Sequence, residues 1–250
     1  MGPLPLTLEQ LQEHLGELLA ELLLGAHIAP AQENATPIVG AFGRVFEAMT
    51  RLDTAPPPHT HETARSATQL GASAYRLLNT AVDCLDRNEP TRGTQLALLH
   101  VGFAYWVARH GGAIPDLAVL VEHLARLDSR DTTARIDPAE LTTVMLALVD
   151  NLATQRARTR THDRGDPRDP WRLLHLHLRD AAQCTRRNDL IQHAHTRLLR
   201  HLPDDVAGCG HSAAATPSAR TAAIPETTRE TTRDTRLGEH RRESHKPTLH

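Results

Sequence analysis

The 17 histidines of this chain could take part in more kinds of chemistry than its other residues, because imidazole can bind metals and can gain or lose a proton near neutral pH. His177, Asp180 and Cys184 follow one another at three- and four-residue steps, which places them on one face of a helix. Imidazole, carboxylate and thiolate all bind metals. These three residues are therefore candidate metal ligands, although so many histidines also produce such spacings by chance.

Other catalytic patterns are incomplete or missing. His61 and Glu62 begin like the zinc-protease motif His-Glu-x-x-His, but Arg65 stands in place of the second histidine. The sequence has no Gly-x-Ser-x-Gly, no glycine-rich nucleotide loop and no Glu-x-x-His pair for a di-iron site. The only lysine is Lys246, which excludes Schiff-base chemistry from the preceding part. We therefore expect no cofactor and favour a protein that is not an enzyme.

Two groups of like charge are candidate partner-binding sites. The first is an acidic row at four-residue spacing, formed by Glu9, Glu13, Glu17 and Glu21. Like charges at this spacing repel within a helix, so the row is either a solvated face or a surface for a basic partner. The second is a group of arginines, formed by Arg156, Arg158, Arg160, Arg164 and Arg168. It is either a solvated linker or a site for phosphate or an acidic partner.

The elements that position these residues are predicted to be helices. Apolar residues, mainly leucine, recur at three- and four-residue steps, and no alternating strand pattern occurs. The fold class is therefore all-α, an irregular multi-helix bundle or a short αα-hairpin solenoid of about eight helices. The expected helices span about 8–24, 37–52, 62–87, 92–110, 115–127, 138–154, 170–187 and 189–201.

The segment 92–110 is apolar on nearly all sides, which is typical of a helix at the centre of a bundle. We expect Leu99, Phe103 and Trp106 to contact several other helices from it. His100 lies in the same segment, so it is either a base with a shifted pKa or a neutral histidine of the core.

The domain organisation follows from where the apolar pattern stops. Residues 1–205 form one helical domain, in which an Arg-rich loop at 156–169 precedes a terminal αα-hairpin at 170–202. Residues 206–250 contain too few large apolar side chains to offset the entropy lost on folding, so we expect a disordered polar tail. Its Arg, Ala, Thr, Pro, Ser and His content also fits a frameshifted GC-rich reading frame, which is a second hypothesis for the tail.

Charge and cysteine usage narrow the class of protein. The 28 basic and 30 acidic residues nearly balance, so no global field attracts nucleic acid or an anionic membrane. The three cysteines form no Cys-x-x-Cys pair and the longest apolar run is too short to span a bilayer. These features predict a soluble, cytoplasmic protein with no membrane partner.

By exclusion, the sequence favours a protein-interaction or assembly module that binds a protein partner or associates with itself. The first alternative is a small-molecule or metal-binding helical bundle, with or without enzymatic activity, that uses His100, Tyr105 and the histidines of the segment 170–187. The second is weak nucleic-acid binding through the Arg-rich loop. Nucleic acid is the least expected partner, because aromatic residues that could stack on bases are missing from that loop.

Overall fold

A computed structural model describes residues 4–26, 35–54, 61–84, 90–128, 136–159 and 168–203. Within these residues the protein is all-helical, as predicted, and contains eight helices and no strand. None of the helices in this part is both long and apolar enough to cross a membrane. The helices are α1 (Leu8–Ala26), α2 (Ala35–Thr54), α3 (His61–Asp83), α4 (Pro90–Arg109), α5 (Leu117–Asp128), α6 (Pro138–Thr159), α7 (Pro170–Thr185) and α8 (Asn188–His201).

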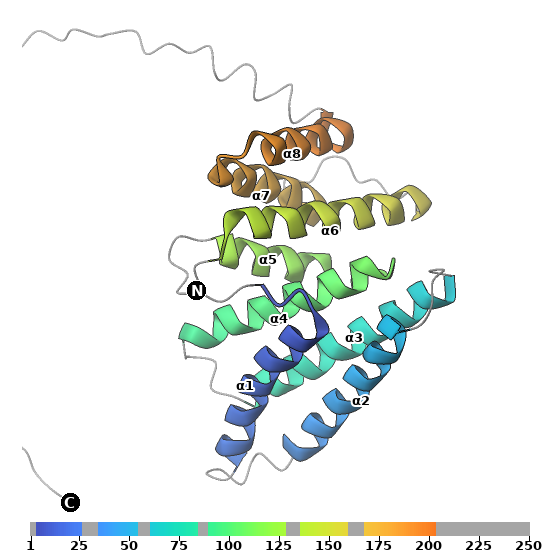
Figure 1. The fold of residues 1–250 in the computed structure, drawn as a ribbon, viewed down its shortest axis with the longest axis vertical. Coiled ribbons are helices and arrows are strands. Elements are labelled where there is room, and N and C mark those ends of the chain that lie inside the picture. The colour runs from blue at the N-terminus through green and yellow to red at the C-terminus, as the bar shows by residue number, and fades with distance from the viewer. Residues whose placement is uncertain are drawn as a thin grey trace, which may run out of the picture.

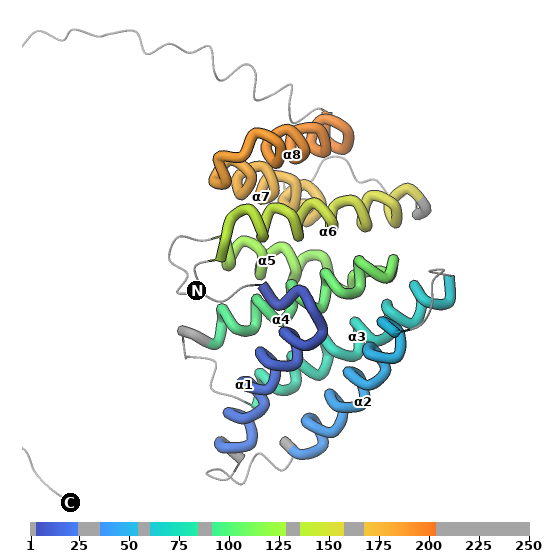
Figure 2. Tube along the Cα trace, viewed as in Figure 1, coloured from blue at the N-terminus to red at the C-terminus, as the bar shows by residue number. Residues whose placement is uncertain are grey.

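The helices stack along one axis, with α1, α2 and α3 at one end and α7 and α8 at the other (Figure 1). The chain path runs back and forth through this stack (Figure 2). From α4 onward each helix also contacts the helix two places further along the chain, in the pairs α4·α6, α5·α7 and α6·α8. This pattern is typical of stacked helical hairpins. The first part is less regular, because α1 packs on both α2 and α4.

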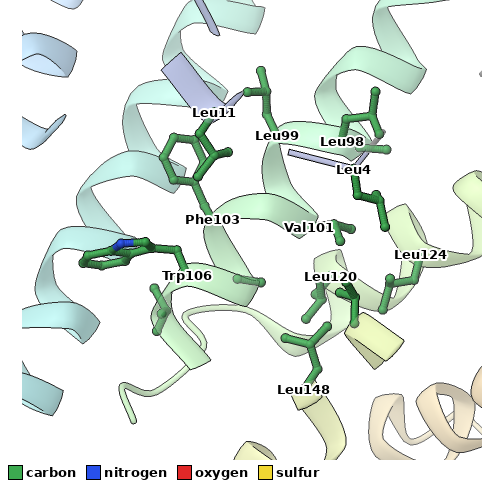
Figure 3. Close-up of a cluster of buried hydrophobic side chains, with 14 of the residues drawn as sticks. Leu4, Leu11, Leu98, Leu99, Val101, Phe103, Trp106, Leu120, Leu124 and Leu148 are labelled. Atoms are coloured by element: carbon green, nitrogen blue, oxygen red, sulfur yellow. The ribbon is translucent and has the colours of Figure 1, made fainter. Parts of the chain in front are cut away.

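The centre of the core is α4, as the sequence predicts, since it contacts α1, α3, α5 and α6. Leu99 and Phe103 are fully buried and Trp106 is 2% exposed. Figure 3 shows side chains of the N-terminal segment and of α5 gathered around this helix. Gly102 permits the backbone of the N-terminal segment to approach α4 closely, because a Cβ atom there would lie 2.6 Å from the carbonyl oxygen of Pro5.

Side-chain caps begin several helices where the sequence predicts them. Gln10 Oε1 accepts from the backbone N–H of Thr7 at 3.0 Å, and Thr7 Oγ1 accepts from the N–H of Gln10 at 3.3 Å. These two bonds form the predicted capping box. Asp169 caps α7 by accepting from Trp171 N at 3.1 Å. α5 begins two residues later than expected, because Asp116 caps it by accepting from Val119 N at 3.1 Å.

The prediction that helix 138–154 ends before an Arg-rich loop was wrong at its boundary, because α6 continues to Thr159. Its apolar pattern stops near Leu152, but polar side chains extend the packing. Asn151 Nδ2 donates to the carbonyl oxygen of Ala108 at 3.1 Å, and Gln155 Nε2 donates to that of Gly112 at 2.7 Å. Hydrogen bonds from side-chain amides to the end of α4 and to the turn after it therefore hold the last turns of α6, and hydrophobic periodicity cannot reveal them.

The longer α6 changes the setting of the arginine group. Arg156 and Arg158 belong to a helix rather than to a loop, and Arg168 is an exposed residue just before α7. Arg160 and Arg164 lie outside the described residues, and so does the tail predicted for residues 206–250.

Candidate functional site

The predicted metal ligands His177, Asp180 and Cys184 all lie on α7. Asp180 forms an ion pair with Arg179 at 2.8 Å, and Cys184 is exposed. Asp128 of α5 lies near His177 and Asp180. Burial is the main cause that raises the pKa of Asp128; His177 lowers this pKa and Asp180 raises it. Across the described ranges no three His, Cys, Asp or Glu side chains form a group that could hold a metal ion.

The four glutamates of the acidic row are exposed on α1. Glu21 pairs with Arg92 of α4, whose guanidinium lies 3.1 Å away and is 9% exposed in its side chain. Glu9, Glu13 and Glu17 form no ion pair within the ranges that the structure describes. One arginine of the fold therefore neutralises the C-terminal end of the row, while three carboxylates face solvent.

An apolar strip runs beside these carboxylates. Gly16, Ala20 and Leu24 are exposed at four-residue spacing, and a Cβ atom at Gly16 would meet nothing within 4 Å. Leu24 is 67% exposed and Leu23 is 37% exposed. We call the combined surface the α1 outer face, which is defined by Glu9, Glu13, Gly16, Glu17, Ala20 and Leu24.

A polar cluster lies inside the core where α3, α4 and α5 meet. The Tyr75 hydroxyl donates to the backbone carbonyl of His100 at 3.0 Å, and the two rings meet edge to face with centroids 4.6 Å apart. The His100 ring also stacks on His123 of α5 at 4.3 Å. His100 Nδ1 lies 3.0 Å from the carbonyl oxygen of Leu96, so this nitrogen carries the proton and Nε2 has a lone pair.

Two nitrogens of this cluster have no hydrogen-bond partner among the residues that the structure describes. They are His100 Nε2 and His123 Nδ1, and both are buried. Burial lowers the pKa of His100, and burial followed by repulsion from His100 and Arg126 lowers that of His123 to about 3. Both rings are therefore neutral at pH 7. For His100, this favours the second of the two sequence interpretations, a neutral histidine of the core.

A cleft of about 470 Å³ opens one helical turn away from this cluster. It is lined by Asn79, Val82, Asp83, Arg92, Gly93, Leu96 and Arg126. The residues of the cleft lie on the same three helix faces as the cluster. On α3, Asn79 follows Tyr75 by four positions, and on α4, Leu96 precedes His100 by four. On α5, Arg126 follows His123 by three positions. The cleft and the buried histidines are therefore two levels of one junction.

A second polar cluster joins α7 and α8. His175 is 1% exposed, and its Nδ1 lies 3.0 Å from the carbonyl oxygen of Trp171 while its Nε2 lies 3.0 Å from His201 Nδ1. Because a carbonyl only accepts, His175 Nδ1 is protonated, and His201 donates to its Nε2. Burial first, and then His201 and Arg156, lower the pKa of His175 to about 4 against the opposing effects of the Trp171 carbonyl and Asp169.

Arg156 covers this second cluster. Its guanidinium carbon lies 5.3 Å from the centre of the Trp171 ring, and a terminal nitrogen lies 3.8 Å from a carboxylate oxygen of Asp169. Arg156 was predicted to be a partner-binding residue, but these contacts give it a place in the packing between α6 and α7. Exposed Arg168 and the helical Arg158 complete the described part of the group.

A third cluster ties α2 to α4. Asp53 Oδ1 accepts from Trp106 Nε1 at 3.1 Å and lies 2.8 Å from His110 Nε2. His110 Nδ1 lies 2.9 Å from the carbonyl oxygen of Trp106. Both ring nitrogens of His110 therefore face hydrogen-bond acceptors.

Sequence reasoning missed the contact between His175 and His201. The other two histidines of α8, His193 and His195, are exposed, and His201 is the partner. The turn between the two helices lies at residues 186 and 187, so a residue near 200 comes opposite His175 in an antiparallel hairpin. Counting outward from the predicted turn could have identified His201. Asp53 offered no comparable signal, because its partner Trp106 lies 53 residues away in the sequence.

Comparisons with known proteins found no similarity: no family model matches the sequence, and neither a curated protein nor a solved structure matches the chain.

Proposed function

We propose that the protein is an interaction module that binds a basic, amphipathic helix of a partner protein through the α1 outer face. The observation that carries the proposal is a row of three exposed carboxylates, Glu9, Glu13 and Glu17, with no ion pair in the described part of the chain. Side chains of the same charge at this spacing cost a few tenths of a kcal/mol per pair in an isolated helix. Arginines of a partner remove this repulsion.

The apolar strip beside the carboxylates supports a helix as the partner. Gly16 and Ala20 are small enough for another helix to approach closely, and Leu24 offers an apolar contact at the end of the strip. A complementary helix presents an apolar stripe to this strip and arginines to the glutamates, which is a recurring mode of helix recognition. Charge complementarity of this kind increases specificity and the rate of association.

Site-specific crosslinking tests the proposal. A photo-reactive amino acid replaces Ala20 on the α1 outer face, and a matched control replaces exposed Gln192 on α8. In extract from the native cells, we expect one discrete adduct with a basic protein from position 20 and none from position 192. The double variant E13Q/E17Q should lose the adduct but keep its melting temperature, because solvated carboxylates contribute little to folding.

Three outcomes decide between the partners and the proposal. An adduct of twice the chain mass from purified protein alone identifies a second copy as the partner and supports an assembly role. An adduct that forms only in extract supports a different partner. The same adduct from both positions, or an adduct that persists unchanged in E13Q/E17Q, contradicts recognition by the α1 outer face.

A further inference from the structure

We propose that the cleft between α3, α4 and α5 binds a small organic anion that carries a carboxylate or phosphate group. This site is independent of the α1 outer face, and the chemistry of its walls defines the ligand. Arg92 and Arg126 supply guanidinium groups, which bind planar or tetrahedral oxyanions through paired N–H donors. Val82 and Leu96 supply apolar surface for the rest of a small molecule.

The position of Arg126 depends on Gly93, which has no side chain. A Cβ atom at Gly93 would collide with Arg126 Nη1, so any other residue there would displace the guanidinium. Glycine costs stability inside a helix compared with alanine. Its presence at this position allows the charge of α5 to lie against the backbone of α4, at the wall of the cleft.

Arg92 is held in place before any ligand arrives. Its side chain is 9% exposed and pairs with Glu21 of α1 at 3.1 Å, while Arg126 pairs with Glu122 at 3.4 Å. A guanidinium has five N–H donors, so it can contact a ligand anion while it keeps an ion pair with a protein carboxylate. A side chain ordered in advance loses little entropy on binding.

The remaining polar residues of the cleft restrict the class of ligand. The Asp83 carboxylate and the Asn79 amide line the same wall, so they favour a ligand that also carries a hydrogen-bond donor, such as a hydroxyl group. A hydroxy acid or a phosphate ester of a small polyol has both features. Bulky polyanions do not fit a cleft of about 470 Å³.

The buried histidines one turn further along give a second, independent reason to expect a ligand at this junction. Among the described residues, neither His100 Nε2 nor His123 Nδ1 has a hydrogen-bond partner, and a buried polar atom without a partner lowers stability. Natural proteins keep few such atoms, and each is commonly explained by an unseen water or by a functional role. A ligand hydroxyl that enters through the cleft, or a water that it orders, can donate to His100 Nε2 and can pair with His123 Nδ1 in either tautomer of that ring.

Calorimetric titration of the full chain tests the site with two defined probes, inorganic phosphate and malate, at constant ionic strength set with sodium chloride. We expect saturable binding of at least one probe. R126Q should weaken it about tenfold or more, because a hydrogen bond to a charged group contributes roughly 1.5–3 kcal/mol. R76Q is the matched control, since Arg76 is exposed on α3 and does not line the cleft.

Gly93→Ala separates loss of the site from loss of the fold. The added methyl group displaces the end of a flexible side chain, so the variant should remain as stable as the wild type and still bind at least tenfold more weakly. Gly43→Ala on α2, where a Cβ atom meets nothing within 4 Å, should bind like the wild type. Binding of phosphate alone assigns a phosphoryl ligand, and binding of malate alone assigns a carboxylate.

The proposal is overturned if neither probe binds at tens of millimolar, or if R126Q and Gly93→Ala bind as tightly as the wild type. Neither result bears on the crosslinking test, because the α1 outer face and the cleft share no residue. Equally, loss of the α1 adduct in E13Q/E17Q leaves the anion site untouched.

Discussion

Replacing His175 with glutamine should make the protein less sensitive to acid. The pKa of His175 is lowered to about 4, first by burial, whereas an unfolded histidine has a pKa of about 6.5. Folding therefore favours the neutral ring. This contribution to stability is complete above about pH 6.5 and is lost as the pH falls toward 4.

The size of the effect follows from the two pKa values. At pH 5 the unfolded chain gains a proton at this position that the folded chain does not, which lowers the free energy of unfolding by roughly 2 kcal/mol relative to pH 8. The charged groups that face His175 are Arg156 of α6, Asp169 before α7 and His201 of α8. They remain in the variant, so their direct contributions to the pH dependence largely cancel in a comparison.

Urea unfolding at pH 8 and pH 5, followed by tryptophan fluorescence, measures this difference. The wild type should lose about 2 kcal/mol more than His175→Gln between the two pH values. His193→Gln is the control, because His193 is exposed on α8, and it should behave like the wild type. If His175→Gln loses as much stability as the wild type to within about 0.5 kcal/mol, the buried ring is not the acid-sensitive group and the argument fails.

Two substitutions test the packing around α4. Leu99→Ala should lower the free energy of unfolding by about 2–5 kcal/mol in chemical denaturation. The control Leu24→Ala, at a position 67% exposed, should change this free energy by less than about 0.5 kcal/mol. Similar losses for the two variants would show that α4 is not the centre of the core. Gly102→Ala should destabilise the protein by more than 1 kcal/mol, because the methyl group collides with the backbone of Pro5. Gly16→Ala, which meets no neighbour, should be neutral or stabilising, and equal melting temperatures for the two variants would argue against this close approach.

The fold could be predicted from the sequence because apolar spacing and helix caps are local signals. Thr7 with Gln10, and Asp169 before Pro170, mark helix starts through contacts between near neighbours in the chain. The end of α6 was not predictable in this way. Gln155 is held by Gly112, a contact between positions 43 residues apart, and no local pattern records it.

The candidate sites differ in the same way, because one depends on local spacing and the other on contacts between helices. The acidic row of α1 is visible in the sequence because its spacing matches one helix. The cleft is not, because Arg92 and Arg126 come from different helices, and only the packing of α4 against α5 brings them to one opening. The stacking of His100 on His123 was equally hidden. Single residues from separate helices become a site only after the tertiary contacts are known.

The close approach of Pro5 to Gly102 has a consequence for synthesis on the ribosome. The N-terminal segment emerges first, but its partner on α4 follows roughly 100 residues later, which corresponds to about 5 to 20 seconds of translation. During that interval the leucines that α1 buries in the finished fold have α2 as a neighbour but not yet α4. Of the nascent chain, α1 therefore remains longest without its final packing partner. It is also the first helix that a chaperone can bind.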